Sequence, residues 1–563
     1  MNAGSAERTL NQVRHQLSNV FSQKISLKDI KTKNEQLRTD HFLARSLAAL
    51  YLTSELNLNA REAAGYVTDG ENDNGIDAIY YDEQKNILHI VQSKWRHSPK
   101  KGIKLDEIIK FREGVEDIVT SNFQNVNEKV TRYKSLINRA LDDINVNVVM
   151  ALIHTSENYL NEDAHKRISD FLEKQNEFME DFLSFKEYGL KEVADRTREQ
   201  ARPENIDIEV LMHQWGRVDT PYEAFYGLVS GQEIANWHQQ YGSRLFAENL
   251  RFILEKSEVN DAMIETIRDR PSSFWYFNNG ITAICNTINK KPLGGPTRES
   301  GVFDVRGISI INGAQTVGAV SRATESYSVD DVKIQMRIIS LQGTPNEFAS
   351  DVTRANNTQN DLTSMDFASL DEQQERLRQE LSDIGVVYTY RRGQTAPDPK
   401  AGFDLRAATI ALACYQSDLR LAVYAKRYIS ALWEDIDKPP YTQLFNESLS
   451  GRFLWRLVQM MRGVDDFLEN EAANSSGRDR LIAVHGNRFI LHCVLNNTDL
   501  SNMGKKRYPV ATKINKCKQI AGEILEILRD EINSRYPDSY PGNIFKNQER
   551  QKELREHIYR RYR

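Results

Sequence analysis

The chain has 563 residues, of which 40% are hydrophobic and 27% charged, and its net charge is only -5. This composition is ordinary for a soluble globular protein of several domains, and it excludes a polycation, so any nucleic-acid surface must be local. No run of about 18 apolar residues marks a membrane span, and the polar N-terminus has no apolar signal segment. The four cysteines form no CxxC pair, so we expect a cytoplasmic protein without a zinc or disulfide framework and without membrane contact.

The first predicted elements are helices over residues 5 to 66, where DHFLARSLAALYLTSEL repeats its apolar residues at nearly helical spacing. After the turn-rich stretch VTDGENDNG, strands are expected over 76–81 and 87–94. A helix from Leu105, a strand over 145–155, a second helical segment and a strand over 206–212 complete this half. Strands that alternate with helices predict an α/β sheet.

The pattern changes near residue 240, where YGSRLFAENLRFILE predicts an amphipathic helix. The segments FWYFNNGITAICNTI, FDVRGISIINGAQTVGAV and DVKIQMRIISL predict strands with polar turns at their ends. From residue 400 the pattern is mostly helical. The expected fold class is therefore α/β, or α+β overall: a mixed sheet flanked by helices, a second α/β domain and a mostly helical C-terminal region.

A hairpin over residues 75–95, GIDAIYYDEQKNILHIVQSKW, carries polar residues at one end of both strands. Residues i and i+2 of a strand share a face, so Gln92 and Lys94 point the same way, and the carboxylate of Asp77 can reach the same edge. Carboxylate and amide oxygens suit Mg²⁺, with Mn²⁺ as a substitute, and the backbone carbonyl of Ser93 could supply a third oxygen. Lys94 can orient a metal-bound water or stabilise transition-state charge. These four residues therefore predict metal-assisted phosphodiester hydrolysis.

This arrangement, an acid on one strand and acid-x-Lys on the next, resembles the PD-(D/E)xK nuclease superfamily. Ile76 stands where the commonest form has proline, and Gln92 replaces the second acid, as in the Q-x-K variant of Mrr-like restriction nucleases. The amide removes one negative charge, so we expect weaker metal binding. The resemblance implies a restriction-endonuclease-like sheet and a further acid on the preceding helix. Glu55 is the candidate for that acid, with Glu62 behind it.

The same hairpin is also consistent with a solvated turn, since exposed strands often end in lysine. The apolar run ILHIV, however, predicts a central buried strand, and polar residues at its end are costly unless they are used. Beyond the hairpin, a basic stretch without an intervening acid is a candidate track for nucleic-acid phosphates. Its members are Arg96, Lys100, Lys101 and Lys104. A solvated loop would show the same composition.

Short turns rich in amides follow the strands of the second half, in FNNGIT (277–282), IINGAQTVGA (310–319) and the RANNTQN segment from Arg354. Asn and Gly tolerate left-handed backbone angles, and amide side chains can read a base edge, a ribose or another loop. Amides without a candidate nucleophile or histidine predict recognition instead of hydrolysis, and a purely structural amide network is the alternative. The residues predicted to line one cleft are Asn278, Asn279, Asn312, Gln315, Thr316, Arg354 and Asn357.

These segments, taken in order with YGSRLFAENLRFIL and MDFASLDEQQERL, resemble the AIPR family, the abortive infection phage resistance proteins of bacteria. The resemblance covers roughly residues 240–400, and the helical tail is compatible with it. It implies antiphage defence, with a PD-(D/E)xK-like segment in front of the AIPR region. The segment IINGAQTV is also similar to D-G-Q-H-R of ParB-like proteins, but Asn312 and Thr316 replace its Asp and Arg, which speaks against nucleotide hydrolysis.

Four segments are expected: an N-terminal helical segment (1–40), a nuclease domain (41–215), an AIPR core domain (216–400) and a helical C-terminal region (401–563). The expected function is Mg²⁺-dependent hydrolysis of DNA in antiphage defence, with the AIPR domain sensing, binding or assembling. An RNase with the same site and a non-catalytic sensor of nucleic acid or phage protein are the alternatives. Because cutting both strands of a duplex needs two sites, we expect a homodimer or larger homo-oligomer. A phage-derived trigger or a neighbouring defence protein is a further candidate partner.

Overall fold

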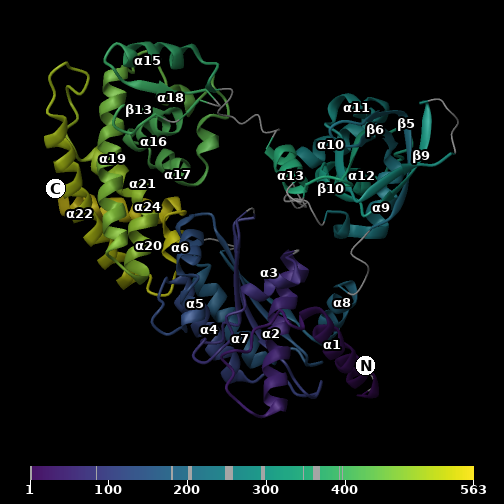
Figure 1. Cartoon of the computed structure of the whole chain (residues 1–563). Helices are drawn as coiled ribbons and strands as arrows, with labels where there is room; N and C mark the ends of the chain where they lie inside the picture. Colours follow the sequence, from purple (N-terminus) through teal and green to yellow (C-terminus); the bar gives the residue numbers. More distant parts are fainter. Residues whose placement is uncertain are drawn as a thin grey trace. The chain divides into compact units, whose positions relative to one another are not determined.

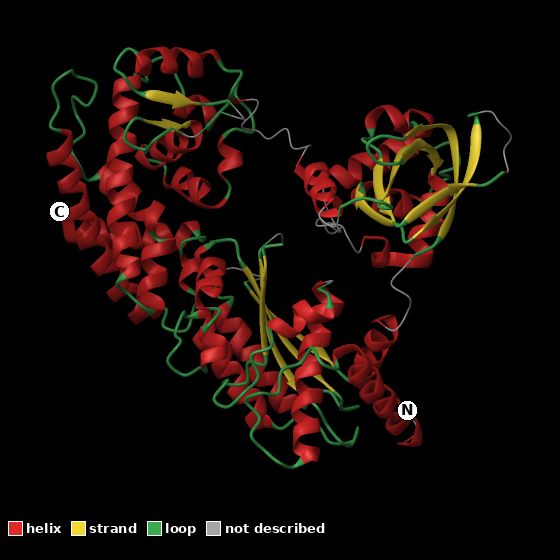
Figure 2. Cartoon of the chain, viewed as in Figure 1, coloured by secondary structure: helices red, strands yellow, loops and turns green. Residues whose placement is uncertain are grey.

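The chain forms two compact units in the computed structural model: Met1–Thr197 together with Leu362–Arg563, and Arg198–Asp361. Figures 1 and 2 show their helices and strands. The structure describes residues 3–56, 58–83, 85–178, 182–200, 206–246, 258–292, 298–345, 348–358, 368–391, 394–395 and 397–562. Of the described helices, none combines the length and the apolar character that a membrane span requires.

A four-stranded mixed sheet forms the centre of the N-terminal part of the first unit. The antiparallel hairpin β1 (Ala78–Asp82) and β2 (Ile87–Lys94) continues through the parallel strands β3 (Asn147–His154) and β4 (Leu183–Tyr188). β2 and β3 are buried along nearly their whole length, because helices cover both faces of the sheet, as parallel strands require. The residues at the carboxyl end of β2 therefore lie where the strand emerges from the hydrophobic core.

Helices divide between the two faces of this sheet. One face packs against α1, α2, α3 and α8, in a core that joins Leu47 to Val91 and Ala151. The other face packs against α4, α5, α6 and α7, in a core that joins Phe111 to Ile90. Their bounds are α1 (Ala3–Phe21), α2 (Glu35–Leu56), α3 (Ala60–Gly65), α4 (Leu105–Val119), α5 (Glu128–Thr131), α6 (Lys134–Asp142), α7 (Glu162–Gln175) and α8 (Leu190–Gln200).

The C-terminal part of the first unit is helical, apart from the parallel pair β12 (Val387–Thr389) and β13 (Gly402–Asp404). Its core is built on the contact between α19 and α22, and it reaches the N-terminal part through α6 and α20 (Figure 1). The helices are α15 (Glu372–Ser382), α16 (Leu405–Tyr415), α17 (Leu419–Arg427), η3 (Ile429–Leu432), α18 (Tyr441–Leu444), α19 (Gly451–Ala473), α20 (Gly477–His485), α21 (Asn487–Asn496), α22 (Val510–Arg535), α23 (Pro541–Ile544) and α24 (Gln548–Tyr562).

The second unit is built on a seven-stranded sheet of order β10-β7-β11-β6-β5-β9-β8, in which only β11 and β7 are parallel. Its strands are β5 (Ile208–Val218), β6 (Ala224–Ser230), β7 (Ile281–Cys285), β8 (Thr287–Lys290), β9 (Ser300–Arg306), β10 (Ser309–Asn312) and β11 (Lys333–Ser340). Its helices are α9 (Gly231–Tyr241), η1 (Gly242–Phe246), α10 (Glu258–Asp269), η2 (Pro271–Ser273), α11 (Phe274–Phe277), α12 (Ala314–Ala323) and α13 (Phe348–Thr358).

The predicted fold class is confirmed: mixed sheets are flanked by helices, and the C-terminal region is helical. The strand expected at 206–212 was placed in the wrong half, because β5 pairs with β6 and β9 of the second sheet. FWYF and AQTVGAV are helices, not parts of strands, and the half-exposed strand β4 was not predicted. Of the helix expected from residue 240, Gly242–Phe246 forms a 3₁₀ turn, and residues 247–257 lie outside the described residues.

Candidate active site

The loop between α3 and β1 is held closely to the start of β1. The backbone N–H groups of Thr68 and Asp69 both donate to the carbonyl oxygen of Asp77, at 2.8 and 3.2 Å. The hydroxyl of Thr68 donates to the carbonyl of Ile76 at 2.7 Å. Within the loop, the carboxylate of Asp73 accepts from two glycine N–H groups at 2.8 and 3.1 Å. These bonds fix the backbone position from which the side chain of Asp77 projects.

A glycine lets this loop pass close to the end of β2. Gly75 has a φ of +75°, and a Cβ atom there would lie 2.7 Å from Nε2 of Gln92 and 3.0 Å from the backbone of Phe111. Any other residue would therefore suffer both backbone strain and a clash. Glycine is therefore required two residues before Asp77, because it lets the chain pass close enough to β2 for the acid to reach that strand.

Asp77 is buried, and its carboxylate is bound by the neighbouring strand. The backbone N–H of Ser93 donates to Oδ2 of Asp77 at 2.6 Å, and Oγ of Ser93 lies 3.0 Å from the same oxygen. Burial raises the pKa of Asp77 to about 7, while the positive charge of Lys94 lowers the pKa and the nearby Asp69 and Asp73 raise it. A carboxyl group with such a pKa is typical of functional sites, because its charge lacks full compensation from the protein.

Gln92 follows Val91, the residue of β2 that pairs with Ala78 and whose carbonyl accepts from the N–H of Asp77 at 2.8 Å. The side chain is fully buried, and its Nε2 donates a long bond of 3.4 Å to the carbonyl of Glu107 on α4. Its Oε1 atom has no hydrogen-bond partner among the described residues. A buried amide oxygen without a partner costs about 1–3 kcal/mol, so this oxygen is suited to a ligand that the protein itself does not supply.

The backbone of Ser93 faces the same position. In the parallel ladder with β3, the N–H of Thr155 donates to the carbonyl of Lys94, so the backbone groups of Lys94 face β3. Because successive residues of a strand direct these groups to opposite sides, the carbonyl of Ser93 faces the β1 side, beyond the first residue of that strand. The predicted third oxygen therefore lies on the same side as Asp77.

Lys94 is the last residue of β2 and is partly exposed. On its strand it shares a face with Gln92, as expected from the period of two. Its ammonium group lies near enough to the carboxylate of Asp77 to lower the pKa of that group by charge attraction. The structure thus brings Asp77, Gln92, Ser93 and Lys94 together at one end of a buried strand.

These residues form a set that suits a hard divalent cation. Asp77, Gln92 and the carbonyl of Ser93 would hold Mg²⁺ or Mn²⁺ through oxygen atoms only, the ligand type that both ions prefer. The unpartnered Oε1 of Gln92 is the observation that supports the fit, since a cation would satisfy this atom. Lys94 would remain outside the ligand set and free to contact a phosphate.

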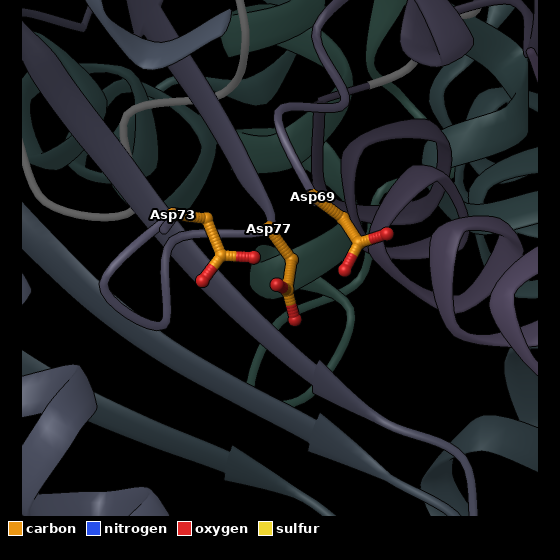
Figure 3. A group of neighbouring side chains, drawn as sticks. All are labelled: Asp69, Asp73 and Asp77. Atoms are coloured by element: carbon orange, nitrogen blue, oxygen red, sulfur yellow. The ribbon is translucent and has the colours of Figure 1, made fainter. Parts of the chain in front are cut away.

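Two further acids, which the sequence reasoning did not assign, lie beside Asp77. One carboxylate oxygen of each of Asp69, Asp73 and Asp77 lies within 4.8 Å of the others, and Figure 3 shows Asp77 between the other two. Asp69 pairs with the buried Arg45 at 2.6 Å, and Asp73 with Lys110 at 3.4 Å. The signal in the sequence is the acidic loop itself, where the three acids recur every four residues.

Glu55, the predicted helix acid, lies elsewhere. It forms ion pairs with Arg196 and, at 3.8 Å, with Lys186, on α8 and β4. The part of α2 beside the site is the turn of Ala44, whose carbonyl accepts from Ser93 Oγ at 2.8 Å. At 1.5 Å per residue, Glu55 lies about 16 Å further along the helix. The alternative acid Glu62 accepts a bond from Asn59 at the start of α3. The structure brings neither acid to Asp77.

The basic stretch after β2 divides into one structural and three exposed residues. Arg96 forms an ion pair with Glu107 on α4, and this ion pair fixes the guanidinium group of Arg96. Lys100, Lys101 and Lys104 are exposed, and Lys104 stands at the start of α4. The three lysines therefore remain available to phosphates, while Arg96 helps to hold α4 beside Gln92.

The predicted amide cleft of the second unit is partly assembled. Asn278 exchanges hydrogen bonds of 3.0 and 3.3 Å with Thr316 on α12, and its Oδ1 accepts from the N–H of Gly280 at 2.8 Å. Asn312 ends β10 opposite Thr282 of β7, and Gln315 follows it on α12. These bonds give Asn278 and Thr316 a structural role.

The other predicted members of this cleft are more dispersed. Asn279 is exposed beside the aromatic residues of α11. Arg354 and Asn357 lie on α13, and their side chains are outside the described residues. Of the predicted members, Asn278 and Thr316 thus meet at the turn that precedes β7, where Asn278 locks the backbone.

One family comparison identifies the second half of the chain. Residues 246–563 match the family described as AIPR protein. No curated protein and no solved structure matches the chain. The matched region contains FNNGIT, IINGAQTV and the helices of the C-terminal part, and it covers more than half of the 563 residues. The chain belongs to the AIPR family, and this membership suggests a part in abortive infection, a form of antiphage defence.

Proposed function

We propose that the N-terminal sheet carries a metal-dependent nuclease site that hydrolyses phosphodiester bonds of DNA. The observation that carries this proposal is the unpartnered, fully buried amide oxygen of Gln92, next in sequence to Ser93, whose backbone N–H and hydroxyl bind the buried carboxylate of Asp77. Polar groups of this kind are costly in a core unless a ligand uses them. A bound Mg²⁺ would supply a Lewis acid and a water molecule of lowered pKa.

Each residue of the site has a separate part in this proposal. Asp77, Gln92 and the carbonyl of Ser93 would hold the ion, and the N–H of Ser93 keeps the carboxylate of Asp77 in place. The ammonium group of Lys94 would contact the scissile phosphate and stabilise the negative charge that develops on it. The exposed Lys100, Lys101 and Lys104 would contact neighbouring phosphates and contribute affinity that falls with salt.

The test of this function is cleavage by the purified full chain. Supercoiled plasmid, phage DNA and a structured RNA are incubated with Mg²⁺, Mn²⁺ or EDTA. We expect nicked and linear plasmid with either metal and no product with EDTA. Cleavage of RNA alone would make the protein an RNase with the same site. If no metal supports cleavage and phage protection survives the loss of Asp77, the protein acts as a non-catalytic sensor.

We also propose a homodimer or larger homo-oligomer as the active form, because one site cuts only one strand. Nicks should then dominate at low protein concentration and double-strand breaks at high concentration. Gel electrophoresis quantifies the nicked and linear products, and light scattering of the same samples measures the oligomeric state. Double-strand breaks by a protein that stays monomeric at every concentration would contradict this arrangement.

Replacing Lys94 with methionine should reduce the cleavage rate by on the order of 10²-fold, because the charge on the phosphate loses its partner. Methionine keeps most of the length of the side chain, and Lys94 is not one of the proposed ligands. Mg²⁺ binding, followed by calorimetry, should therefore persist or become tighter. Lys85→Met on the same hairpin is the matched control and should cleave normally. Equal rates for Lys94→Met and wild type would remove Lys94 from the site.

Replacing Gln92 with glutamate should lower the Mg²⁺ concentration needed for half-maximal cleavage by about tenfold, because an added negative charge strengthens binding of a hard cation. Without metal the variant should be less stable than wild type, since the new charge is buried. Gln92→Met, which has a similar volume and no oxygen, should raise the Mg²⁺ requirement. An unchanged Mg²⁺ dependence in both variants would show that residue 92 is not a ligand.

A further inference from the structure

The second unit exposes a group of aromatic side chains around a pocket of about 550 Å³. Three of these rings line the pocket, with exposed fractions of 76% for Tyr276, 43% for Tyr226 and 42% for Trp275. Phe277, the next residue of α11, is 63% exposed. The rings of Trp275 and Tyr276 lie edge to face, with their centroids 5.1 Å apart. Aromatic residues gathered in this way on a surface mark an interaction site, since scattered single exposures are the ordinary case.

Helix α11, which carries Trp275, Tyr276 and Phe277, is anchored to the core of the unit at both of its ends. Phe274, the first residue of α11, is buried in the core of the unit, and Asn278 closes the turn through its bonds to Gly280 and Thr316. Gly280 has a φ of +79°, and a Cβ atom there would lie 2.4 Å from the carbonyl oxygen of Gln335. The chain therefore lies directly on β11. The exposed rings are held out by this anchoring, so the surface is preorganised for a ligand.

Polar residues line the pocket next to the rings. The registers place Arg337 of β11 between Tyr226 of β6 and Thr282 of β7, so the three side chains form a row on one face of the sheet. Arg337 donates to Oγ1 of Thr282 at 3.2 Å. Gln335, two residues before Arg337, and Asn279 add amide groups. No aspartate or glutamate lines the pocket among the described residues.

This combination matches the chemistry of an unpaired nucleotide. Aromatic side chains stack on bases, amides can bond to base edges, and a guanidinium group pairs with phosphate or stacks on a base. The pocket volume falls in the ordinary range for ligand sites, and Arg337 is part of its lining. A protein partner would also cover aromatic residues, but the amides of Asn279 and Gln335 beside the rings favour a base, whose edge offers hydrogen-bond donors and acceptors.

We propose that this aromatic pocket binds the unpaired bases of a single-stranded nucleic acid. The site would thus recognise exposed bases in a part of the chain other than the nuclease site. Stacking does not depend on the identity of the base, so binding should tolerate sequence changes. DNA and RNA single strands share this chemistry, and the experiment separates them.

The test is fluorescence anisotropy with the full chain in EDTA, so that cleavage does not interfere. The probes are labelled oligonucleotides of about 12 nucleotides: single-stranded DNA, single-stranded RNA and duplex DNA of the same sequence. We expect tighter binding of one or both single strands than of the duplex. Trp275→Ala and Tyr276→Ala should each weaken that binding by roughly tenfold, and Trp275→Phe should retain most of it. Arg337→Gln should reduce the salt slope of binding by about one.

Tyr428→Ala, which removes a similarly exposed ring from the other unit, is the matched control and should bind normally. Circular dichroism shows whether each variant keeps its fold, which we expect because the changed rings are exposed. Equal affinity for duplex and single strands, or unchanged binding in both aromatic variants, would overturn the proposal. This result is independent of the nuclease proposal, because the assay excludes metal and the changed rings belong to the second unit, while the proposed nuclease site belongs to the first.

Discussion

Replacing Asp77 with asparagine should abolish cleavage and, in the absence of metal, increase the stability of the protein. Asparagine has the same shape, and its oxygen can still accept the bond from the N–H of Ser93. The variant loses the only carboxylate of the proposed ligand set. Since loss of an outer-shell partner already costs metal sites about 10–100-fold, loss of this ligand should cost more than about 100-fold in rate.

The increase in stability follows from the pKa of Asp77. Its carboxyl group has a pKa of about 7 in the folded protein, raised from 3.8 by burial. As the pH rises from 4 to 7, the unfolded chain gives up this proton while the folded chain keeps it, so the free energy of unfolding falls. Asparagine does not ionise, so its advantage grows over this range to roughly 4 kcal/mol, at about 1.4 kcal/mol per pKa unit.

Urea denaturation in EDTA at pH 5 and pH 8 measures this difference. Asp82→Asn, at the other end of β1, is the control and should change neither cleavage nor the pH dependence of stability. An Asp77→Asn protein that is inactive and also less stable would indicate a structural carboxylate. One that cleaves at the wild-type rate would exclude Asp77 as a ligand. Loss of activity combined with a gain in stability is the signature of a functional residue.

Much of the candidate site could be predicted because strand geometry is local. The apolar runs before Gln92 and after Asp77 place β2 and β1 almost to the residue, and a period of two puts Gln92 and Lys94 on one face. The antiparallel register, which pairs Ala78 with Val91, then brings Asp77 to the end of β2 that carries Gln92. Each step depends only on neighbours within the hairpin, so the sequence contains the necessary information.

The parts that were missed depend on contacts between distant segments. The acidic loop folds back so that Asp69 and Asp73 flank Asp77, and this path is set by hydrogen bonds that no periodic pattern encodes. Helical spacing shows which side of α2 is apolar, but not which turn lies over the strand end. Ala44, and not Glu55, therefore lies beside Ser93. The strand β5 pairs with β9, about 90 residues later, so its sheet could not be read from its neighbours.

The contact between the N-terminal and C-terminal parts of the first unit could likewise not be predicted from the sequence. Tyr540, near the C-terminus, stacks on Phe182 of the N-terminal part with centroids 3.8 Å apart and ring planes at 9°. Its hydroxyl donates to the carbonyl of Leu141 at 3.0 Å and lies 2.9 Å from Nε2 of His485. Nearby, Asn543 donates to the carbonyl of Gln175 at 2.9 Å. The N-terminal part, which carries the candidate site, is thus in direct contact with the AIPR region.

Tyr540→Ala should therefore reduce the free energy of unfolding of the first unit by about 3–5 kcal/mol, the usual cost of removing a buried aromatic side chain. Tyr540→Phe keeps the stacking on Phe182 and loses only the hydroxyl bonds, so it should cost about 1–3 kcal/mol. Tyr428→Ala, an exposed residue of the same unit, should change stability by less than about 0.5 kcal/mol. Denaturant unfolding followed by circular dichroism and tryptophan fluorescence measures all three.

The unfolding curve shows whether the N-terminal and C-terminal parts of the first unit unfold together or separately. Trp95 reports on the N-terminal part and Trp433 on the C-terminal part, so coincident transitions by both probes would show one cooperative unit. We expect Tyr540→Ala to shift both transitions together. A shift of the C-terminal transition alone would mean that the four-stranded N-terminal sheet is stable without the C-terminal helices. If both shift together, the candidate nuclease site folds only when the AIPR helices are in place, and a change in those helices could control its activity directly.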